Sequence, residues 1–171
     1  MKKITLILIL IIPFINLNAQ NMKDSDKRLQ IIEDKMAIKN LVDTFSVLAD
    51  VKDVKSQVLL FTPNAIVQSE SGGKVTSEFK GRDEIGSAFS NFLNLFEIVY
   101  HINGQQTVIL DGDKASGISY CTVTLIGNEN GKKMKTTMGV IYHDEYTREK
   151  GSWLISKRQS NFTWTEKTEL K

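Results

Sequence analysis

Residues 100–126 read YHINGQQTVILDGDKASGISYCTVTLI, in which two apolar-rich segments flank the tripeptide Asp111-Gly112-Asp113. Apolar residues recur along both segments, which predicts one strand over 100–110 and another over 115–126. An Asp-Gly turn between two such segments is typical of a β-hairpin. This stretch therefore predicts two long antiparallel strands joined by a tight turn.

The same pattern continues toward the end of the chain. A turn at 128–131 precedes a strand predicted over 132–148, and Lys150-Gly151 separates that strand from a last one over 152–164. Three hairpins in succession indicate an antiparallel meander. We expect residues 165–171 to form a flexible tail.

The segment before the meander begins with two predicted helices. Asp24 and Ser25 are candidate N-caps for a long amphipathic helix that ends near Asp50. A second, short helix is expected from Asp53 to Leu60, because Pro63 disfavours helical backbone at the residue before it. The apolar residues that recur at a spacing of three to five along the long helix are Leu29, Ile32, Met36, Leu41, Phe45 and Leu48. The stripe is widened by Ile31, Ile38, Val42 and Ala49.

Two short strands and a third helix complete the expected elements. Ala65-Ile66-Val67 begins one strand, Gly72-Gly73 forms a turn, and 75–79 is the return strand. A helix opens at 81–84, with two acids in its first turn where the helix dipole favours negative charge. Three helices ahead of a meander exclude a parallel doubly wound sheet, because the strands lack crossover helices. We predict an α+β fold in which a cone-shaped, curved antiparallel sheet has its concave face closed by three helices, leaving an apolar pocket.

The first 19 residues have the layout of a secretory signal peptide. Two lysines precede an uncharged apolar run, and the small residue Ala19 precedes an expected cut before Gln20. The run is shorter than the roughly 20 residues of a membrane span, so an uncleaved anchor is the weaker alternative. We expect a periplasmic or secreted protein with a polar lead-in at 20–28 and a single domain over 29–164.

The charge balance argues against nucleic-acid and membrane partners. The chain has 22 basic and 20 acidic residues, and because two of the lysines lie in the predicted leader, the mature chain would be neutral. A neutral chain without a basic stripe is a poor partner for nucleic acid or an anionic membrane. Cys121 is the only cysteine, so an exported form has no internal disulfide and its stability must come from packing.

Several segments together resemble the nuclear transport factor 2-like superfamily, specifically its SnoaL-like branch, which is similar to ketosteroid isomerases, scytalone dehydratase and limonene epoxide hydrolase. The resemblance implies a cone-shaped α+β barrel, commonly a homodimer packed through the outer face of its sheet. This fold hosts isomerases, dehydratases, hydrolases, cyclases and binding modules, so the resemblance does not fix a function. The segments that carry it span roughly residues 29–164 and are 41–50, 60–67, 81–85, 101–103, 108–115, 142–146 and 153–158.

Asp50 and His101 are the candidate catalytic residues. Asp50 follows Leu48-Ala49 at the end of the long helix, where a carboxylate can lean over the mouth of a pocket, and His101 opens the first strand of the meander. An imidazole that faces a carboxylate can act as a general acid–base pair without a metal. In scytalone-dehydratase-like relatives an acid at the position of Asp50 works with histidine. The alternative is a solvated helix-end aspartate and a histidine that only binds backbone.

The sequence departs from the dehydratase pattern in two places. Phe45 stands where relatives often have tyrosine, and Ser119 or Cys121 stands where dehydratases carry a second histidine. Both changes remove polar groups that would hold a substrate oxygen or a water. Cys121 could serve as a nucleophile, but it lies in an apolar strand pattern and is expected to be a buried small hydrophobe.

The expected pocket wall is mostly aromatic. Core or interface packing is the commoner use of such side chains. Strand alternation places His143 with Ile141 and Glu145 on a solvent or dimer face. Because the chain lacks a metal-ligand spacing motif, we expect neither a metal nor a cofactor. The pocket-lining candidates are Phe45, Phe61, Phe89, Tyr120, Cys121 and Tyr142.

Two functions remain open at this level. The first is a cofactor-independent lyase or isomerase that acts on a small hydrophobic molecule, with Asp50 and His101 as base and acid. The second is a non-catalytic module of the same fold that binds a hydrophobic small molecule or a peptide. A structural dimer with a filled cone is a third, weaker alternative.

Overall fold

The computed structural model describes residues 12–171 and divides the chain into two compact units, one ending at Met36 and one over Ala37–Lys171. Helix α1 (Ile12–Asp50) begins in the first unit and ends in the second. The helix continues through Asp24 and Ser25, so these residues are not its N-caps. The chain has no glycine or proline between 14 and 50, and nothing there ends a helix.

The predicted signal peptide is only partly covered by these residues. Its basic start and most of its apolar run lie in residues 1–11, outside the described residues, so the signal peptide stays a prediction. In the described part of the chain, no helix combines enough length with enough apolar character to span a bilayer.

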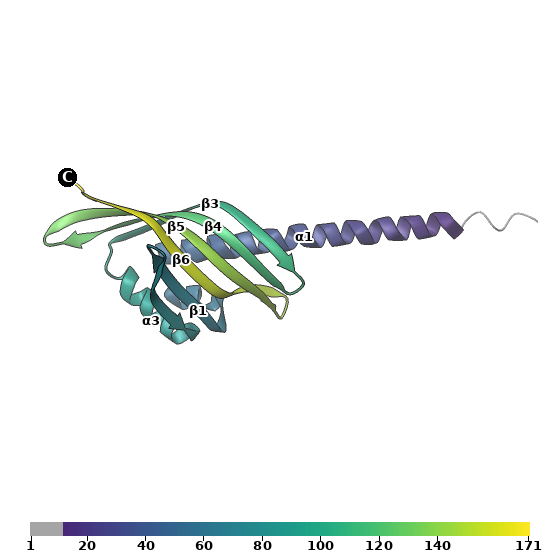
Figure 1. The fold of residues 1–171 in the computed structure, drawn as a ribbon, viewed down its shortest axis with the longest axis horizontal. Coiled ribbons are helices and arrows are strands. Elements are labelled where there is room, and N and C mark those ends of the chain that lie inside the picture. The colour runs from purple at the N-terminus through teal and green to yellow at the C-terminus, as the bar shows by residue number, and fades with distance from the viewer. Residues whose placement is uncertain (1–11) are drawn as a thin grey trace, which may run out of the picture. The chain divides into compact units, whose positions relative to one another are not determined.

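Six strands form one curved sheet, drawn in Figure 1, with the order β2-β1-β6-β5-β4-β3. The α+β fold is therefore confirmed, but the sheet is mixed, because β1 and β6 pair in parallel while all other neighbours are antiparallel. After the β1–β2 hairpin, the chain crosses to the opposite edge of the sheet, where β3 lies. The strands β4, β5 and β6 then follow one another back toward β1, and β6 runs parallel to β1. The strands are β1 (Phe61–Ser71), β2 (Lys74–Lys80), β3 (Ile98–Asp111), β4 (Lys114–Glu129), β5 (Lys132–Glu149) and β6 (Ser152–Glu169).

The last strand extends beyond its expected end at residue 164. Residues 165–169 pair with the start of β5, and Lys132 Nζ forms an ion pair with Glu169 at 2.6 Å. The prediction of a flexible tail over 165–171 is therefore wrong as far as Glu169. The long hairpin gives these polar residues a partner strand, which the local sequence alone does not indicate.

The other helices lie close to where they are expected. The second splits into α2 (Val54–Gln57) and a 3-10 turn, η1 (Val58–Leu60), and Asp53 caps α2 by accepting a hydrogen bond from the backbone N–H of Ser56 at 3.1 Å. Helix α3 (Gly81–Leu93) begins at a glycine with a φ of +75° and lies beside β1 (Figure 1). A side chain at Gly81 would be strained at that φ.

Alternating residues of the strands point to the concave face and pack against the helices. Ile38, Phe61 and Ile155 are fully buried in one apolar cluster, and Leu125 and Val140 lie in a second. Burying one such side chain stabilises a fold by roughly 1.5–3 kcal/mol. The two clusters hold α1 and the sheet together around the space in which the candidate site lies.

Candidate active site

A cavity of about 670 Å³ lies on the concave side of the sheet. This volume is within the range of pockets that bind small molecules. The wall comes from α1, α2, α3 and all six strands, and it is largely aromatic and aliphatic. Its apolar residues include Phe45, Ala49, Phe79, Phe89, Phe92, Val123, Leu125, Tyr142 and Phe162.

Asp50 and His101 contact each other, and of the two only His101 is among the residues that line this cavity. His101 lines the cavity, and its Nδ1 lies 2.7 Å from Oδ1 of Asp50. The backbone N–H of His101 also donates to Oδ2 of Asp50, at 3.3 Å. Both oxygens of the carboxylate thus bind one residue, which fixes the plane of the imidazole. The side chains are 7% exposed for His101 and 22% for Asp50.

These contacts determine the form of His101. A carboxylate can only accept hydrogen bonds, so the ring nitrogen that contacts it, Nδ1, carries a proton. Burial lowers the pKa of His101, and although the hydrogen bond and charge of Asp50 raise that pKa, the net shift is downward. His101 is therefore neutral near pH 7, and Nε2 is available as a base.

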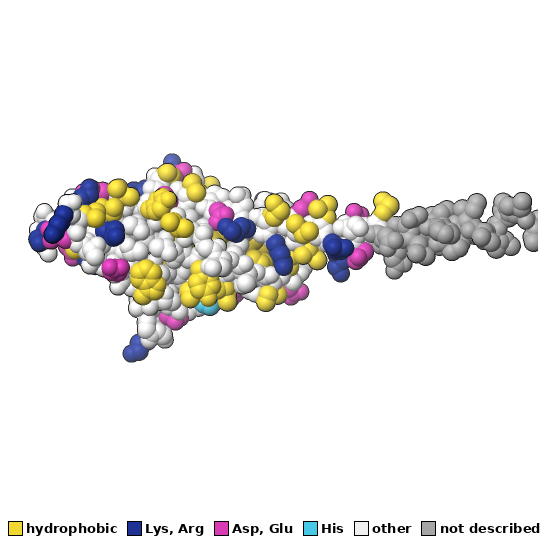
Figure 2. Space-filling view, turned by 90° about the horizontal axis from the view of Figure 1, so that it is seen from above, with side chains coloured by type: hydrophobic (Ala, Val, Ile, Leu, Met, Phe, Trp, Pro, Cys, Tyr) yellow, Lys and Arg dark blue, Asp and Glu magenta, His cyan; other side chains and the backbone are white. Residues whose placement is uncertain are grey.

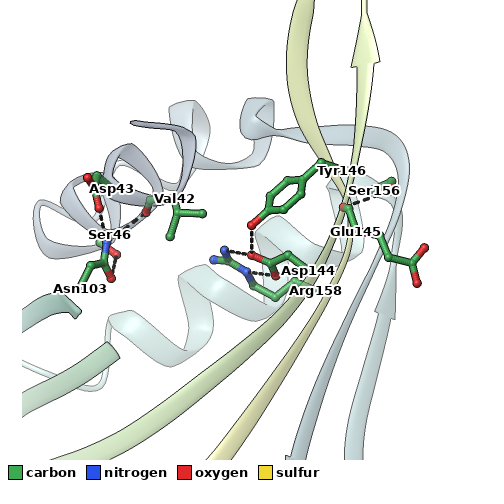
Figure 3. Close-up of polar contacts among 9 residues, drawn as sticks. All are labelled: Val42, Asp43, Ser46, Asn103, Asp144, Glu145, Tyr146, Ser156 and Arg158. Atoms are coloured by element: carbon green, nitrogen blue, oxygen red, sulfur yellow. Dashed lines mark hydrogen bonds and ion pairs between the residues drawn. The ribbon is translucent and has the colours of Figure 1, made fainter. Parts of the chain in front are cut away.

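A polar clamp holds β3 to α1 two residues beyond His101. The amide nitrogen of Asn103 donates to Oδ1 of Asp43 at 2.9 Å, and the hydroxyl of Ser46 donates to Oδ1 of Asn103 at 3.1 Å (Figure 3). Asp43 and Ser46 lie on the last two turns of α1. The clamp therefore fixes the strand that carries His101 against the helix that carries Asp50.

Arg158 is a site residue that the sequence did not reveal. Its Nε and Nη2 donate to the two carboxylate oxygens of Asp144 at 2.8 and 2.6 Å, and Tyr146 donates its hydroxyl proton to the same carboxylate at 2.9 Å (Figure 3). The guanidinium lies 4.2 Å from the ring centroid of Phe45 and 4.3 Å from that of Tyr142. The Arg158 side chain is 1% exposed and lines the cavity.

The charge of Arg158 is secured by its partners. Burial disfavours the cation, but the charge and hydrogen bonds of Asp144 outweigh that effect and raise the pKa of Arg158. The third nitrogen, Nη1, has no hydrogen-bond partner among residues 12–171. A buried cation with a free N–H group beside a cavity can hold an electronegative atom of a ligand.

One sequence signal could have indicated this ion pair. Asp144 shares the inward parity of Val140, Tyr142 and Tyr146 on β5, and a carboxylate on a buried face requires a cation. Its partner could not be chosen from spacing, because a register shift between Glu145 and Tyr146 alters the pairing of β5 with β6.

The structure distributes the six pocket candidates over three environments. Phe45, Phe89 and Tyr142 lie on the cavity wall. Phe61 is fully buried behind it and packs edge-on against Phe45, at 5.9 Å between ring centroids. Tyr120 does not line the cavity, because its parity on β4 directs it to the outer face, where it is 49% exposed.

Cys121 is buried and does not line the cavity either. Burial raises the pKa of its thiol to about 11, so the thiolate is scarce at neutral pH and a nucleophilic role is disfavoured. Burial likewise raises the pKa of Tyr142, whose phenol therefore stays protonated beside Arg158.

His143 lies on the outer face of β5, away from His101. Within residues 12–171, no three His, Cys, Asp or Glu side chains lie close enough to hold a metal ion. The two histidines therefore do not share a site.

Comparisons with known proteins agree with this architecture. The SnoaL-like domain family matches residues 30–159. An uncharacterised protein from Mycobacterium tuberculosis is 24% identical over 127 residues, which cover 74% of this chain and 84% of the relative.

Solved structures of two elimination enzymes, by name, have a similar fold. A hexachlorocyclohexane dehydrochlorinase, LinA type 2, has a TM-score of 0.72 and 19% identity over 84% of this chain and 93% of the other. A candidate scytalone dehydratase from Novosphingobium aromaticivorans has a TM-score of 0.71 and 17% identity, over 86% and 93% of the two chains. At these identities the likeness establishes the fold alone.

Proposed function

This chain belongs to the SnoaL-like domain family, and from that premise we propose that it is a cofactor-independent lyase or isomerase. Its substrate would be a small, largely apolar molecule. His101 acts as the general base, and Asp50 orients and supports it. Asp50 and Arg158 would not react covalently.

The observation that carries the proposal is the contact of His101, which lines the cavity, with the carboxylate of Asp50. With Nδ1 held by Asp50 at 2.7 Å, the ring has one orientation and one tautomer. A neutral imidazole can remove a proton from a carbon next to a carbonyl. The C–H bond breaks, an N–H bond forms on Nε2, and the electron pair moves to the carbonyl oxygen.

Arg158 supports the second half of that step. Negative charge develops on the oxygen as the proton leaves, and a fixed cation in a water-poor site stabilises such charge. The Nη1 amino group of Arg158 is not used by Asp144, and Arg158 lines the same cavity as His101. The proton on Nε2 then returns to another carbon in an isomerase, or protonates a leaving group in a lyase. The two similar structures named for elimination reactions support this class.

The proposal is tested with 2-tetralone, a bicyclic ketone whose C–H groups beside the carbonyl are acidic. We expect the protein to accelerate deuterium incorporation at these carbons in D₂O, as followed by ¹H NMR, above the rate of buffer alone. Binding of the ketone without faster exchange would instead support the alternative of a non-catalytic binding module.

We also propose that two copies of the chain associate through the outer face of the sheet. Isolated monomers rarely expose large continuous apolar patches. Figure 2 shows hydrophobic side chains, aromatic rings among them, on the side of the sheet away from α3. The indole of Trp164 lies against Gly139, where a Cβ would come within 2.0 Å of the ring nitrogen. The exposed large apolar residues of β3, β4 and β6 are Ile98, Tyr100, Ile102, Ile109, Ile118, Tyr120 and Trp164.

A charge placed in that face should separate the copies. We expect the unaltered protein to have twice the monomer mass by size-exclusion chromatography with light scattering. The double variant Ile102→Glu/Tyr120→Glu should be monomeric, because a dimer would bury four uncompensated carboxylates. Val75→Glu, at an equally exposed apolar residue of the β1–β2 hairpin, is the control and should remain dimeric. A monomeric unaltered protein would contradict the proposal.

A further inference from the structure

Gln57 is a buried polar residue that the proposed mechanism does not use. It is the last residue of α2, it is 1% exposed, and it lines the same cavity as His101 and Arg158. Buried polar side chains are as a rule fully hydrogen-bonded, so the hydrogen bonds of Gln57 have to be accounted for.

Only half of the Gln57 amide is satisfied. Its Nε2 donates to the backbone carbonyl of Phe45 at 3.1 Å. This bond fixes the orientation of the amide, because a carbonyl oxygen can accept only from the nitrogen end. The oxygen Oε1 is the other end, and it has no hydrogen-bond partner in the part of the chain that the structure describes.

Two buried side chains that line the cavity therefore each carry an unpaired atom, and the two atoms are of opposite character. Arg158 Nη1 is a donor without an acceptor, and Gln57 Oε1 is an acceptor without a donor. Both side chains contact Phe45. The Arg158 guanidinium lies 4.2 Å from the centre of the Phe45 ring, and the Gln57 amide nitrogen donates to the Phe45 backbone carbonyl. Leaving such groups unpaired costs free energy, so a ligand that pairs both is selected over one that pairs neither.

We propose that Gln57 Oε1 accepts a hydrogen bond from a hydroxyl or N–H group of the substrate. The substrate is then an apolar ring compound with two polar functions, an acceptor oxygen for Arg158 and a donor for Gln57, rather than a plain hydrocarbon or halocarbon. The identity of the bound molecule as a substrate rests on the proposed function, but the donor-recognising subsite at Gln57 does not.

The inference is tested by comparing 2-naphthol with 2-methoxynaphthalene, which differ mainly in the donated proton. By isothermal titration calorimetry, we expect the unaltered protein to bind 2-naphthol about five- to tenfold more tightly, as one hydrogen bond to a buried neutral acceptor allows. In Gln57→Met, which keeps a side chain of similar length, this preference should fall to less than about twofold. The affinity of this variant for 2-methoxynaphthalene should stay within about twofold of that of the unaltered protein.

The control is Gln68→Met, the same change at a glutamine of β1 that does not line the cavity and binds Glu78 instead. It should keep the full preference for 2-naphthol. If Gln57→Met does not fold, the side-chain amide signals of Gln57 in the unaltered protein serve as the readout. They should move on addition of 2-naphthol and stay in place with 2-methoxynaphthalene.

The two ligands binding equally well to the unaltered protein would overturn the subsite, as would a preference that persists in Gln57→Met. These failures are distinct from a failure of the proposed function. Deuterium exchange of 2-tetralone without a preference for 2-naphthol would leave the lyase or isomerase proposal standing and remove the subsite. A preference for 2-naphthol without deuterium exchange would leave the subsite standing and remove the lyase or isomerase proposal.

Discussion

His101→Gln is expected to lower the rate of protein-catalysed deuterium exchange into 2-tetralone by about 10²–10⁴-fold, the usual contribution of a positioned general base. Glutamine has a similar length and can still bind Asp50, but its amide has no basic lone pair. The exchange is measured by ¹H NMR at saturating ketone, so that kcat is compared rather than affinity. A rate within a few-fold of the unaltered protein would exclude His101 as the base.

Asp50→Asn is the second arm of that experiment. The amide can donate as well as accept, so the proton is no longer restricted to Nδ1 of His101. Removing the carboxylate also removes the charge and the hydrogen bond that raise the pKa of His101, which makes the imidazole a weaker base. We expect a loss of similar order. The matched control is His143→Gln, on the outer face of β5, which should exchange at the unaltered rate. Far-UV circular dichroism verifies that each variant is folded.

The pH dependence of the exchange follows from the same pKa. Because burial lowers the pKa of His101 below its usual value of about 6.5, the neutral base is present above that lowered pKa and is lost as the pH falls through it. The acid limb of kcat/KM should therefore fall below pH 6.5. A limb centred above pH 7 would mean that Asp50 outweighs burial, or that another group is the base.

Arg158→Met should lower the free energy of unfolding by about 3–5 kcal/mol, the cost of breaking a buried ion pair. Asp144 is 0% exposed and would keep a carboxylate with only the hydroxyl of Tyr146 as a close side-chain donor. The measurement is urea denaturation followed by circular dichroism. A loss below about 1 kcal/mol would show that the pair is solvated or formed differently.

Two controls separate the buried charge from the lost packing. The double variant Asp144→Leu/Arg158→Met removes both charges and should recover much of the stability, because an apolar replacement of a buried pair is often neutral. Lys133→Met breaks an ion pair with Glu97 in which both side chains are nearly half exposed. That change should cost roughly 0–1 kcal/mol.

The strand meander and the third helix could be predicted from local sequence, because period-2 patterns, Asp-Gly turns and first-turn acids act over a few residues. The parallel pairing of β1 with β6 and the ordered end of β6 could not. Both depend on which strands meet after the chain has turned several times.

The site divides in the same way. Asp50 and His101 could be proposed because each lies at the end of a predicted element and matches a family position. Arg158 and Gln57 could not be predicted as site residues, because their roles depend on distant partners. Arg158 binds Asp144, which is 14 residues away in sequence, and Gln57 binds the carbonyl of Phe45, which is 12 residues away. Residue type alone does not indicate that Tyr120 lies outside the cavity, because the alternation of β4 decides which face of the sheet the side chain occupies.

The central claim is that His101 presents a neutral Nε2 lone pair to the cavity while Asp50 holds the proton on Nδ1. Long-range ¹H–¹⁵N NMR of the histidine-labelled protein at pH 7 measures this directly, and His143→Gln assigns the signals because the chain has only two histidines. We predict that the His101 ring has a protonated Nδ1 and an unprotonated Nε2. A proton on Nε2, or a doubly protonated ring at that pH, would contradict the account.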